Sequence, residues 1–523
     1  MKLKRISAIF MANAKSFKLE GNYSKAFYWL LAFSFLYLLP ILIANFYYID
    51  DVGRSFRGNI SWNSDGRPLM KAIVVFLSNG KPIMDVSPWM QIAAVIVLDY
   101  ALVLFLRKYV SSASALQIFC VAACSYANWF LLENVSYKYE SLGMLTSISI
   151  PFVLYSLPET MDIKKQVPIT IIAVLISLSI YQASIGTYVS LAVLEAVYHL
   201  TQKTAWKQIA RQVTMRAGAI LAGSLLYKLT IAKRFVPQTG YSSEHAHLVR
   251  LSSQGIYAVY HHLLSFGAMW KEHLQTLNYI GVLLVVAMCI GIIHLAFVVW
   301  RSREESFAVK LGTLFFILAT PILLMVSSVI AMLVLEHPIF TPRVMLSFTV
   351  VTLFAGLMIY HLSQVHKGFL VIAGLTLMIT LSFSSAYGNL LTRQDQTNSL
   401  VAARLARDMD EIEMQTGQTI KYVSFIGHSP KCKELLLYAQ KRPLLNRLVP
   451  IYMNDNWYWG GSYLSHFRTE QLHMLPDKVW SKKADLTYIS QRASIRHNEF
   501  YQLYLQQNRI IVVFPRTVNV GLI

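Results

Sequence analysis

The chain has 523 residues, of which 55% are hydrophobic and only 14% are charged. In soluble globular proteins about a quarter of all residues are charged. This composition therefore excludes an ordinary soluble protein and indicates a polytopic α-helical membrane protein. Much of the formal net charge of +20 lies in short loops between apolar runs, which is the positive-inside pattern and favours membrane lipids, not nucleic acid, as partners.

The first apolar run follows a basic N-terminal segment. Residues 1–25 alternate lysines with apolar side chains, and we expect a cytoplasmic interfacial segment there. Residues 26–48 are long enough to cross a bilayer. Asp50 and Asp51 then emerge on the opposite side, in a first outer loop of residues 49–88. With the N-terminus inside, that side is the outer one, in the bacterial case the periplasm.

About ten further crossings are expected between that loop and residue 391. The tract 167–200 is interrupted at Tyr181-Gln182-Ala183-Ser184 and fits one tilted helix with a re-entrant piece or two short helices, and the basic residues after it favour two. A second outer loop is expected at residues 233–277. The spans, about eleven with the first, are residues 89–106, 112–132, 142–157, two within 167–200, 217–231, 279–300, 311–335, 344–362 and 369–391.

Two shorter features complete the organisation. Residues 68–77 are apolar but too short to span, so we expect a helix lying along the membrane. From residue 392 to residue 523 the composition becomes that of a soluble domain, which the crossings place in the periplasm. An amphipathic helix at 398–413, a strand-like run at 421–426, a helix at 431–440 and a terminal β run at 509–514 predict a small α/β domain.

Ionisable side chains gather at the expected outer ends of the membrane helices. Adjacent carboxylates at Asp50 and Asp51 raise each other's pKa while nearby arginines lower it, and this opposition can leave one of them ready to accept a proton from a sugar hydroxyl. Alternatively, the two aspartates cap the helix end and begin a solvated loop. Guanidinium forks suit the phosphate of a lipid-linked substrate. The full set is Asp50, Asp51, Arg54, Arg67, Lys138, Glu140, Tyr181, Gln182 and Arg343.

Other motifs are less informative. Neither a GxxxxGK[ST] loop nor a GxGxxG after a strand is present, so direct use of a nucleotide is unsupported. His245, His247, His261 and His262 lack a clear third partner, so we assign no metal site and no required cofactor, although a divalent metal remains open. Trp457, in an aromatic segment of the terminal domain, suits either a sugar platform or a buried cluster.

Four separated motifs resemble a known family. Tyr48-Ile49-Asp50-Asp51-Val52-Gly53-Arg54-Ser55, then Trp62 with Gly66-Arg67-Pro68-Leu69, Tyr137-Lys138-Tyr139-Glu140-Ser141-Leu142 and Ser179-Ile180-Tyr181-Gln182-Ala183-Ser184, are similar in type and order to those of the bacteriophage serotype-converting glucosyltransferases of enterobacteria, membrane enzymes that modify O-antigen. The likeness ends near Tyr188. Glu140 is a departure, because aspartate is expected there at least as often.

The resemblance implies a GT-C type bundle with its catalytic carboxylate in the first outer loop. It implies inverting transfer of glucose from undecaprenyl-phosphate-glucose to an O-antigen sugar, with a companion lipid-glucose synthase and a companion flippase. A lipid-linked saccharide flippase or transporter, or a GT-C transferase acting on lipid A or protein, remain alternatives. The expected roles are catalysis by Asp50, Asp51 and Glu140, donor-phosphate binding by Arg54, Arg67, Lys138 and Arg343, and substrate binding by Tyr181, Gln182, Trp62 and Trp457.

Overall fold

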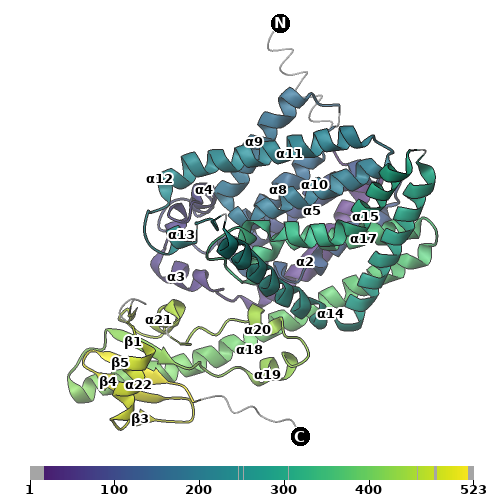
Figure 1. The fold of residues 1–523 in the computed structure, drawn as a ribbon. Coiled ribbons are helices and arrows are strands. Elements are labelled where there is room, and N and C mark those ends of the chain that lie inside the picture. The colour runs from purple at the N-terminus through teal and green to yellow at the C-terminus, as the bar shows by residue number, and fades with distance from the viewer. Residues whose placement is uncertain are drawn as a thin grey trace.

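The computed structural model describes residues 17–515 except 159, 246, 251, 304, 456 and 476–479. Most of the expected interfacial segment 1–25 therefore lies outside the described residues. Long helices form one bundle, and a smaller unit that contains the sheet lies at one end of it (Figure 1).

The bundle helices lie close to the expected spans. Residues 167–200 form two helices, as the charge pattern favoured, separated by an extended Tyr181 and a 3-10 turn at Gln182–Ser184. The main helices of the bundle are α2 (Asn22–Ala44), α5 (Trp89–Tyr109), α6 (Ala115–Cys124), α8 (Ser141–Tyr155), α9 (Ile163–Ile180), α10 (Ile185–Thr201), α11 (Trp206–Tyr227), α14 (Ser253–Ser302), α15 (Phe307–Ser328), α17 (Thr349–Ser363) and α18 (Leu370–Thr416).

Shorter helices connect them. The 68–77 segment is indeed helical. These elements are α3 (Asp50–Arg57), α4 (Pro68–Leu77), α7 (Leu131–Ser136), α12 (Lys233–Phe235), α13 (Tyr241–Glu244) and α16 (Ile330–Leu333), with 3-10 turns η1 (Ser61–Asn63), η2 (Ser125–Ala127), η3 (Gln182–Ser184), η5 (Pro342–Phe348) and η6 (Lys367–Phe369), and a π-helical turn η4 (Lys228–Ala232).

Eight helices within the described residues are long and apolar enough to cross a membrane, fewer than the eleven or so expected. The segments 112–132 and 142–157 fall short because α6 has only 10 residues and α8 only 15. The segment 217–231 belongs to α11, whose polar first half contains Lys207, Arg211 and Arg216. The composition and these helices together make the chain a multi-pass membrane protein.

The expected outer loop 233–277 is helical over its second half. Residues from Ser253 onward belong to α14, which bends at Asn278, where φ is +54°. Apolar side chains such as Phe266 and Met269 recur at helical spacing along this segment and pack into the bundle. The segment 253–277 is therefore a helix that packs on the bundle and not an irregular loop.

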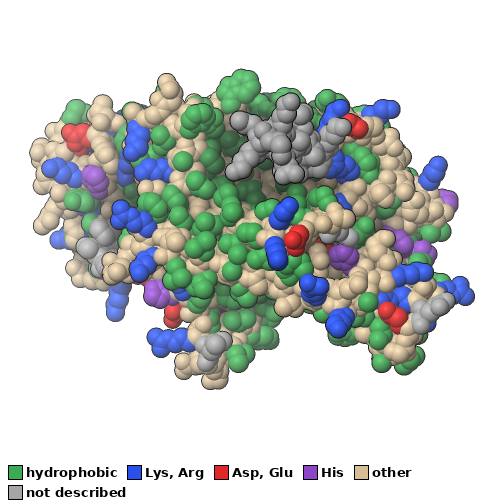
Figure 2. Space-filling view, turned by 90° about the horizontal axis from the view of Figure 1, so that it is seen from above, with side chains coloured by type: hydrophobic (Ala, Val, Ile, Leu, Met, Phe, Trp, Pro, Cys, Tyr) green, Lys and Arg blue, Asp and Glu red, His purple; other side chains and the backbone are tan. Residues whose placement is uncertain are grey.

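One face of the molecule shows the surface expected for contact with lipid. Figure 2 shows broad hydrophobic areas with basic side chains distributed around them. Ile172 of α9 and Leu221 and Leu225 of α11 are each more than half exposed. An apolar surface of this extent is unfavourable in water, because soluble monomers rarely expose large contiguous apolar patches.

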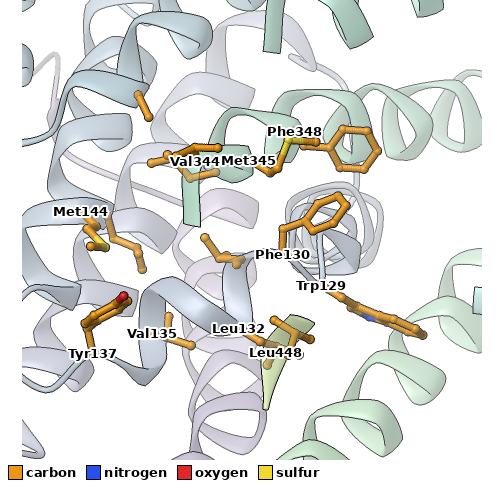
Figure 3. Packing of buried hydrophobic residues seen from close by; sticks show 14 of the residues in the cluster. Trp129, Phe130, Leu132, Val135, Tyr137, Met144, Val344, Met345, Phe348 and Leu448 are labelled. Carbon is orange, nitrogen blue, oxygen red and sulfur yellow. The ribbon is translucent and has the colours of Figure 1, made fainter. Parts of the chain in front are cut away.

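The terminal unit is joined to the bundle by a continuous helix. The 47-residue α18 runs from the bundle into this unit, so the composition change at 392 falls inside a helix and not in a linker. Leu448 of the terminal unit lies in the same core as Trp129 and Phe130, which Figure 3 shows together. Shared burial of this kind holds the two parts in contact.

The sheet of the terminal unit is mixed. Its order is β2-β1-β5-β4-β3, with β1 parallel to β2 and β5, and β4 antiparallel to β5 and β3. The expected strands at 421–426 and 509–514 are β1 and β5, and the expected helix at 431–440 is α19. The elements are β1 (Tyr422–Ile426), α19 (Lys433–Tyr438), α20 (Leu445–Leu448), α21 (Tyr458–Ser465), β2 (His473–Met474), α22 (Lys482–Ser490), β3 (Arg496–His497), β4 (Gln502–Gln506) and β5 (Arg509–Val513).

Candidate active site

The site is built around the short helix α3. Helix α2 ends at Ala44, and the chain turns through Asn45 and Ile49, both with positive φ, before α3 begins. Asp50 and Asp51 occupy its first turn, where carboxylates interact favourably with the helix dipole. The pair therefore begins a new helix, and Asp51 is fully buried, so the solvated-loop interpretation is excluded.

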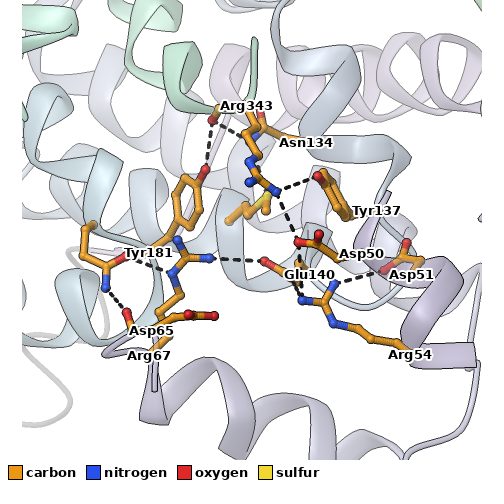
Figure 4. Close-up of polar contacts among 12 residues, drawn as sticks. Asp50, Asp51, Arg54, Asp65, Arg67, Asn134, Tyr137, Glu140, Tyr181 and Arg343 are labelled. Carbon is orange, nitrogen blue, oxygen red and sulfur yellow. Dashed lines mark hydrogen bonds and ion pairs between the residues drawn. The ribbon is translucent and has the colours of Figure 1, made fainter. Parts of the chain in front are cut away.

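Arg54 of α3 joins three carboxylates. Its guanidinium lies 3.3 Å from Asp51 Oδ1 and 3.7 Å from Asp50 Oδ2, and it also forms an ion pair with Glu140 (Figure 4). The guanidinium stacks over the ring of Trp62, 4.5 Å from the centroid. Trp62 is completely buried, so it supports Arg54 and does not offer a free face to a sugar, contrary to its expected role.

The two aspartates differ in access. Asp51 Oδ2 accepts a 2.6 Å hydrogen bond from the backbone N–H of Lys138. Burial raises the pKa of Asp51 to about 7, while Arg54 and the hydrogen bond from Lys138 lower it in part. The side chain of Asp50 is 22% exposed and pairs with Arg343 at 3.2 Å. Of the adjacent pair, Asp50 is thus the carboxylate that a substrate can reach.

Hydrogen bonds hold both the backbone and the side chain of Arg343. It is the second residue of η5, and its backbone N–H donates to Glu133 Oε2 at 3.0 Å. Its carbonyl oxygen accepts hydrogen bonds from Asn134 Nδ2 at 3.0 Å and from the Tyr181 hydroxyl at 3.3 Å. Its guanidinium donates to the Tyr137 hydroxyl at 2.8 Å. This fixed backbone positions the guanidinium beside the partly exposed carboxylate.

Glu133 was not predicted as a site residue. Burial raises its pKa to about 7, and the nearby Arg343 opposes that rise. Its position at the end of an apolar run was visible in the sequence, but its contact with the backbone of Arg343, 210 positions away, was not.

Arg67 lies on the other side of Glu140. Its guanidinium is 3.6 Å from Glu140 Oε2, donates from Nε to Gln182 Oε1 at 2.9 Å, and stacks over the Tyr181 ring at 4.7 Å. Gln182 in turn donates to the backbone oxygen of Asp65 at 2.6 Å. Tyr181 and Gln182 therefore orient the arginines, and the side chain of Arg67 remains 22% exposed.

Two expected site residues lie elsewhere. Lys138 Nζ is buried and already satisfied by Asp85 Oδ2 at 3.0 Å and Asn45 Oδ1 at 2.6 Å, so it is no longer a candidate for the donor phosphate. Trp457 stacks on Tyr452 with ring centroids 6.0 Å apart, in the packing between the terminal unit and the end of α2. Partners distant in sequence occupy Lys138, whereas Trp457 packs on a tyrosine five positions before it.

Across the part of the chain that the structure describes, no group of three or more His, Cys, Asp and Glu side chains is arranged to hold a metal ion. His245 instead lies in hydrogen-bonding contact with the backbone oxygen of His337.

A partly exposed carboxylate beside two partly exposed arginines, at the ends of membrane helices, defines a site suited to group transfer from a phosphorylated donor. The model of the family described as Glucosyl transferase GtrII matches residues 39–354. The chain belongs to this family, which confirms the resemblance drawn from the motifs and implies O-antigen glucosylation.

A relative supports this assignment. The chain is 26% identical over 472 residues to a protein of Salmonella phage P22 described as an uncharacterized 55.3 kDa protein in the gtrB 5' region, covering 88% of this chain and 94% of that protein. No solved structure matches the chain.

Proposed function

We propose that the chain transfers a glucosyl residue from undecaprenyl-phosphate-glucose to a sugar of the O-antigen, on the periplasmic side of the bacterial inner membrane. The observation that carries the proposal is the partly exposed Asp50 paired with Arg343, with Arg67 nearby. This set combines a proton acceptor with cations for a phosphate, which are the two requirements of such a transfer.

Asp50 acts as the general base. Its carboxylate takes the proton of the acceptor hydroxyl as that oxygen forms a bond to the anomeric carbon of glucose. The bond from this carbon to the phosphate oxygen breaks, and its electron pair leaves with undecaprenyl phosphate. A single displacement of this kind inverts the anomeric centre.

Arg343 and Arg67 bind the phosphate. Negative charge grows on the leaving phosphate oxygen in the transition state, and guanidinium groups that are already oriented stabilise it without reorganisation. Glu140 and Asp51 are buried and keep Arg54 and Arg67 in place. Their role is to position these cations and α3, since neither carboxylate is exposed.

The supply of the donor requires two companion proteins. A synthase makes the lipid-linked glucose, and a flippase moves it to the periplasmic leaflet.

The orientation of the chain, with the N-terminus in the cytoplasm and residues 392–523 in the periplasm, is tested by labelling a single cysteine introduced near Asp50 with a membrane-impermeant reagent.

The activity is tested with the full chain in lipid vesicles supplied with undecaprenyl-phosphate-glucose and purified O-antigen polysaccharide. We expect the polysaccharide to gain mass in steps of one hexose, and we expect NMR of the product to show an inverted anomeric configuration. Transfer to lipid A or protein but not to polysaccharide, or movement of the donor across the bilayer without transfer, would refute the proposal.

A further inference from the structure

Helix α21 of the terminal unit packs directly on α3, the helix that carries Asp50 (Figure 1). The closest approach is at Gly53, where a Cβ atom would lie only 2.5 Å from Cζ3 of Trp459. Glycine is required here because no larger residue leaves room for the indole ring. Gly53 is three positions after Asp50, so the two residues are neighbours on one face of α3.

Polar contacts continue the same packing. The guanidinium of Arg57 donates to the Tyr458 hydroxyl and, at 3.3 Å, to Ser462 Oγ. Ser55 Oγ and His466 Nε2 lie 3.2 Å apart. We name the surface formed by Arg57, Tyr458 and Trp459 the α3–α21 seam.

The seam has the chemistry of a saccharide-binding surface. Tyr458 is 50% exposed although it belongs to a helix that is otherwise well packed, and its ring meets that of Trp459 edge to face at 5.0 Å. Exposed aromatic faces pack against the C–H faces of sugar rings, while guanidinium and phenol groups bond to sugar hydroxyls. The seam combines both kinds of group.

We propose that the α3–α21 seam binds the acceptor saccharide, with Tyr458 and Trp459 as the aromatic platform and Arg57 as a hydrogen-bond donor. The inference rests on the proposed function, because it assigns one of its two substrates to a surface. Asp50 and Arg57 are seven positions apart and so lie on one face of α3, which sets the seam alongside the proposed base. Trp459 therefore takes the role that the sequence suggested for Trp457.

The test compares Tyr458→Ala with Tyr438→Ala in the full chain. Tyr438, in α19, is a matched control because it is an exposed tyrosine of the same unit and is 39% exposed. We expect Tyr458→Ala to raise the KM for O-antigen polysaccharide about tenfold and to leave the KM for undecaprenyl-phosphate-glucose unchanged, whereas Tyr438→Ala changes neither. Tyr458→Phe, which keeps the ring, should retain most of the acceptor affinity.

An equal acceptor KM in Tyr458→Ala and Tyr438→Ala would overturn the inference, as would a matching rise in the donor KM. A second measurement does not depend on catalysis: equilibrium binding of a fluorescently labelled O-antigen oligosaccharide to the detergent-solubilised chain. If wild type transfers no glucose, the proposed function fails, yet binding that is weakened by Tyr458→Ala alone still supports the seam. Absence of oligosaccharide binding to wild type would refute it.

Discussion

The replacement of Asp50 by asparagine, compared with the same change at Asp51, separates catalysis from structural support. Asparagine keeps the size of the side chain and removes its charge. Asp50 is the less buried of the two aspartates, and its ion pairs with Arg343 and Arg54 are 3.2 and 3.7 Å long. Arg54 keeps two other carboxylate partners and Arg343 keeps its hydrogen bond to Tyr137, so loss of the Asp50 pairs should lower the free energy of unfolding by about 1 kcal/mol. Removal of a general base lowers kcat by roughly 10²–10⁴-fold.

Asp51→Asn should affect the stability of the fold more than it affects catalysis. Both carboxylate oxygens of Asp51 face donors, Arg54 at 3.3 Å and the backbone N–H of Lys138 at 2.6 Å. The amide of asparagine must direct its NH₂ group at one of them, in a site without water access. Because burial raises the pKa of Asp51 to about 7, part of its population is already neutral, so we expect a loss of about 1–3 kcal/mol, not the larger cost of an unpaired buried charge.

Both variants are measured in detergent by thermal unfolding and in vesicles by the rate of glucose transfer. We expect Asp50→Asn to unfold near the wild-type temperature with transfer almost abolished, and Asp51→Asn to unfold at a lower temperature. Substantial transfer by a correctly folded Asp50→Asn protein would refute the assignment of the base. A wild-type unfolding temperature for Asp51→Asn would refute its structural role.

Three further changes test the surroundings of the site. Arg343→Ala should lower kcat/KM for the donor by about 10–150-fold, with a smaller loss for Arg343→Lys, which keeps the charge; equal losses would contradict binding by charge. The pKa of Glu133 is about 7 in the folded chain against an ordinary 4.5, so the folded state holds a proton that the unfolded state releases, and stability falls as pH rises across that window. Glu133→Gln should reduce this fall between pH 4.5 and about 7, and an unchanged slope in thermal unfolding would exclude Glu133 as its source. Gly53→Ala should cost about 1–3 kcal/mol through its clash with Trp459, and adding Trp459→Leu should restore the unfolding temperature unless the clash is relieved elsewhere.

The hydropathy of the sequence and the periodicity of its apolar residues were sufficient to predict most of the architecture. Long apolar runs located the membrane helices, and the polar interruption at Tyr181 and Gln182 located the break between α9 and α10. The number of spans was less predictable, because apolar composition does not reveal where a helix ends. The run 112–132 contains a ten-residue helix, a 3-10 turn and the start of α7. From Cys120 onward it is buried in protein, and burial in protein demands apolar side chains as much as lipid does.

The site, like the fold, could be predicted from the sequence only in part. Motif order brought together Asp50, Arg54, Arg67 and Glu140, and the expected membrane side added Arg343. The structure joins these five residues through ion pairs. In the sequence, Lys138 was as good a candidate for phosphate binding as Arg343, since both follow membrane segments on the same expected side.

What distinguishes Lys138 from Arg343 is the partner that each finds. Lys138 Nζ meets Asp85 and Asn45, which are 53 and 93 positions away, and these contacts bury it beyond the reach of a substrate. Arg343 meets a carboxylate that is itself partly exposed, so a phosphate can approach both members of that pair. A cation is available to a ligand only when its own side chain stays partly open to solvent. The side chain of Arg343 is 20% exposed and that of Lys138 only 3%, and this difference depends on long-range contacts that no local motif encodes.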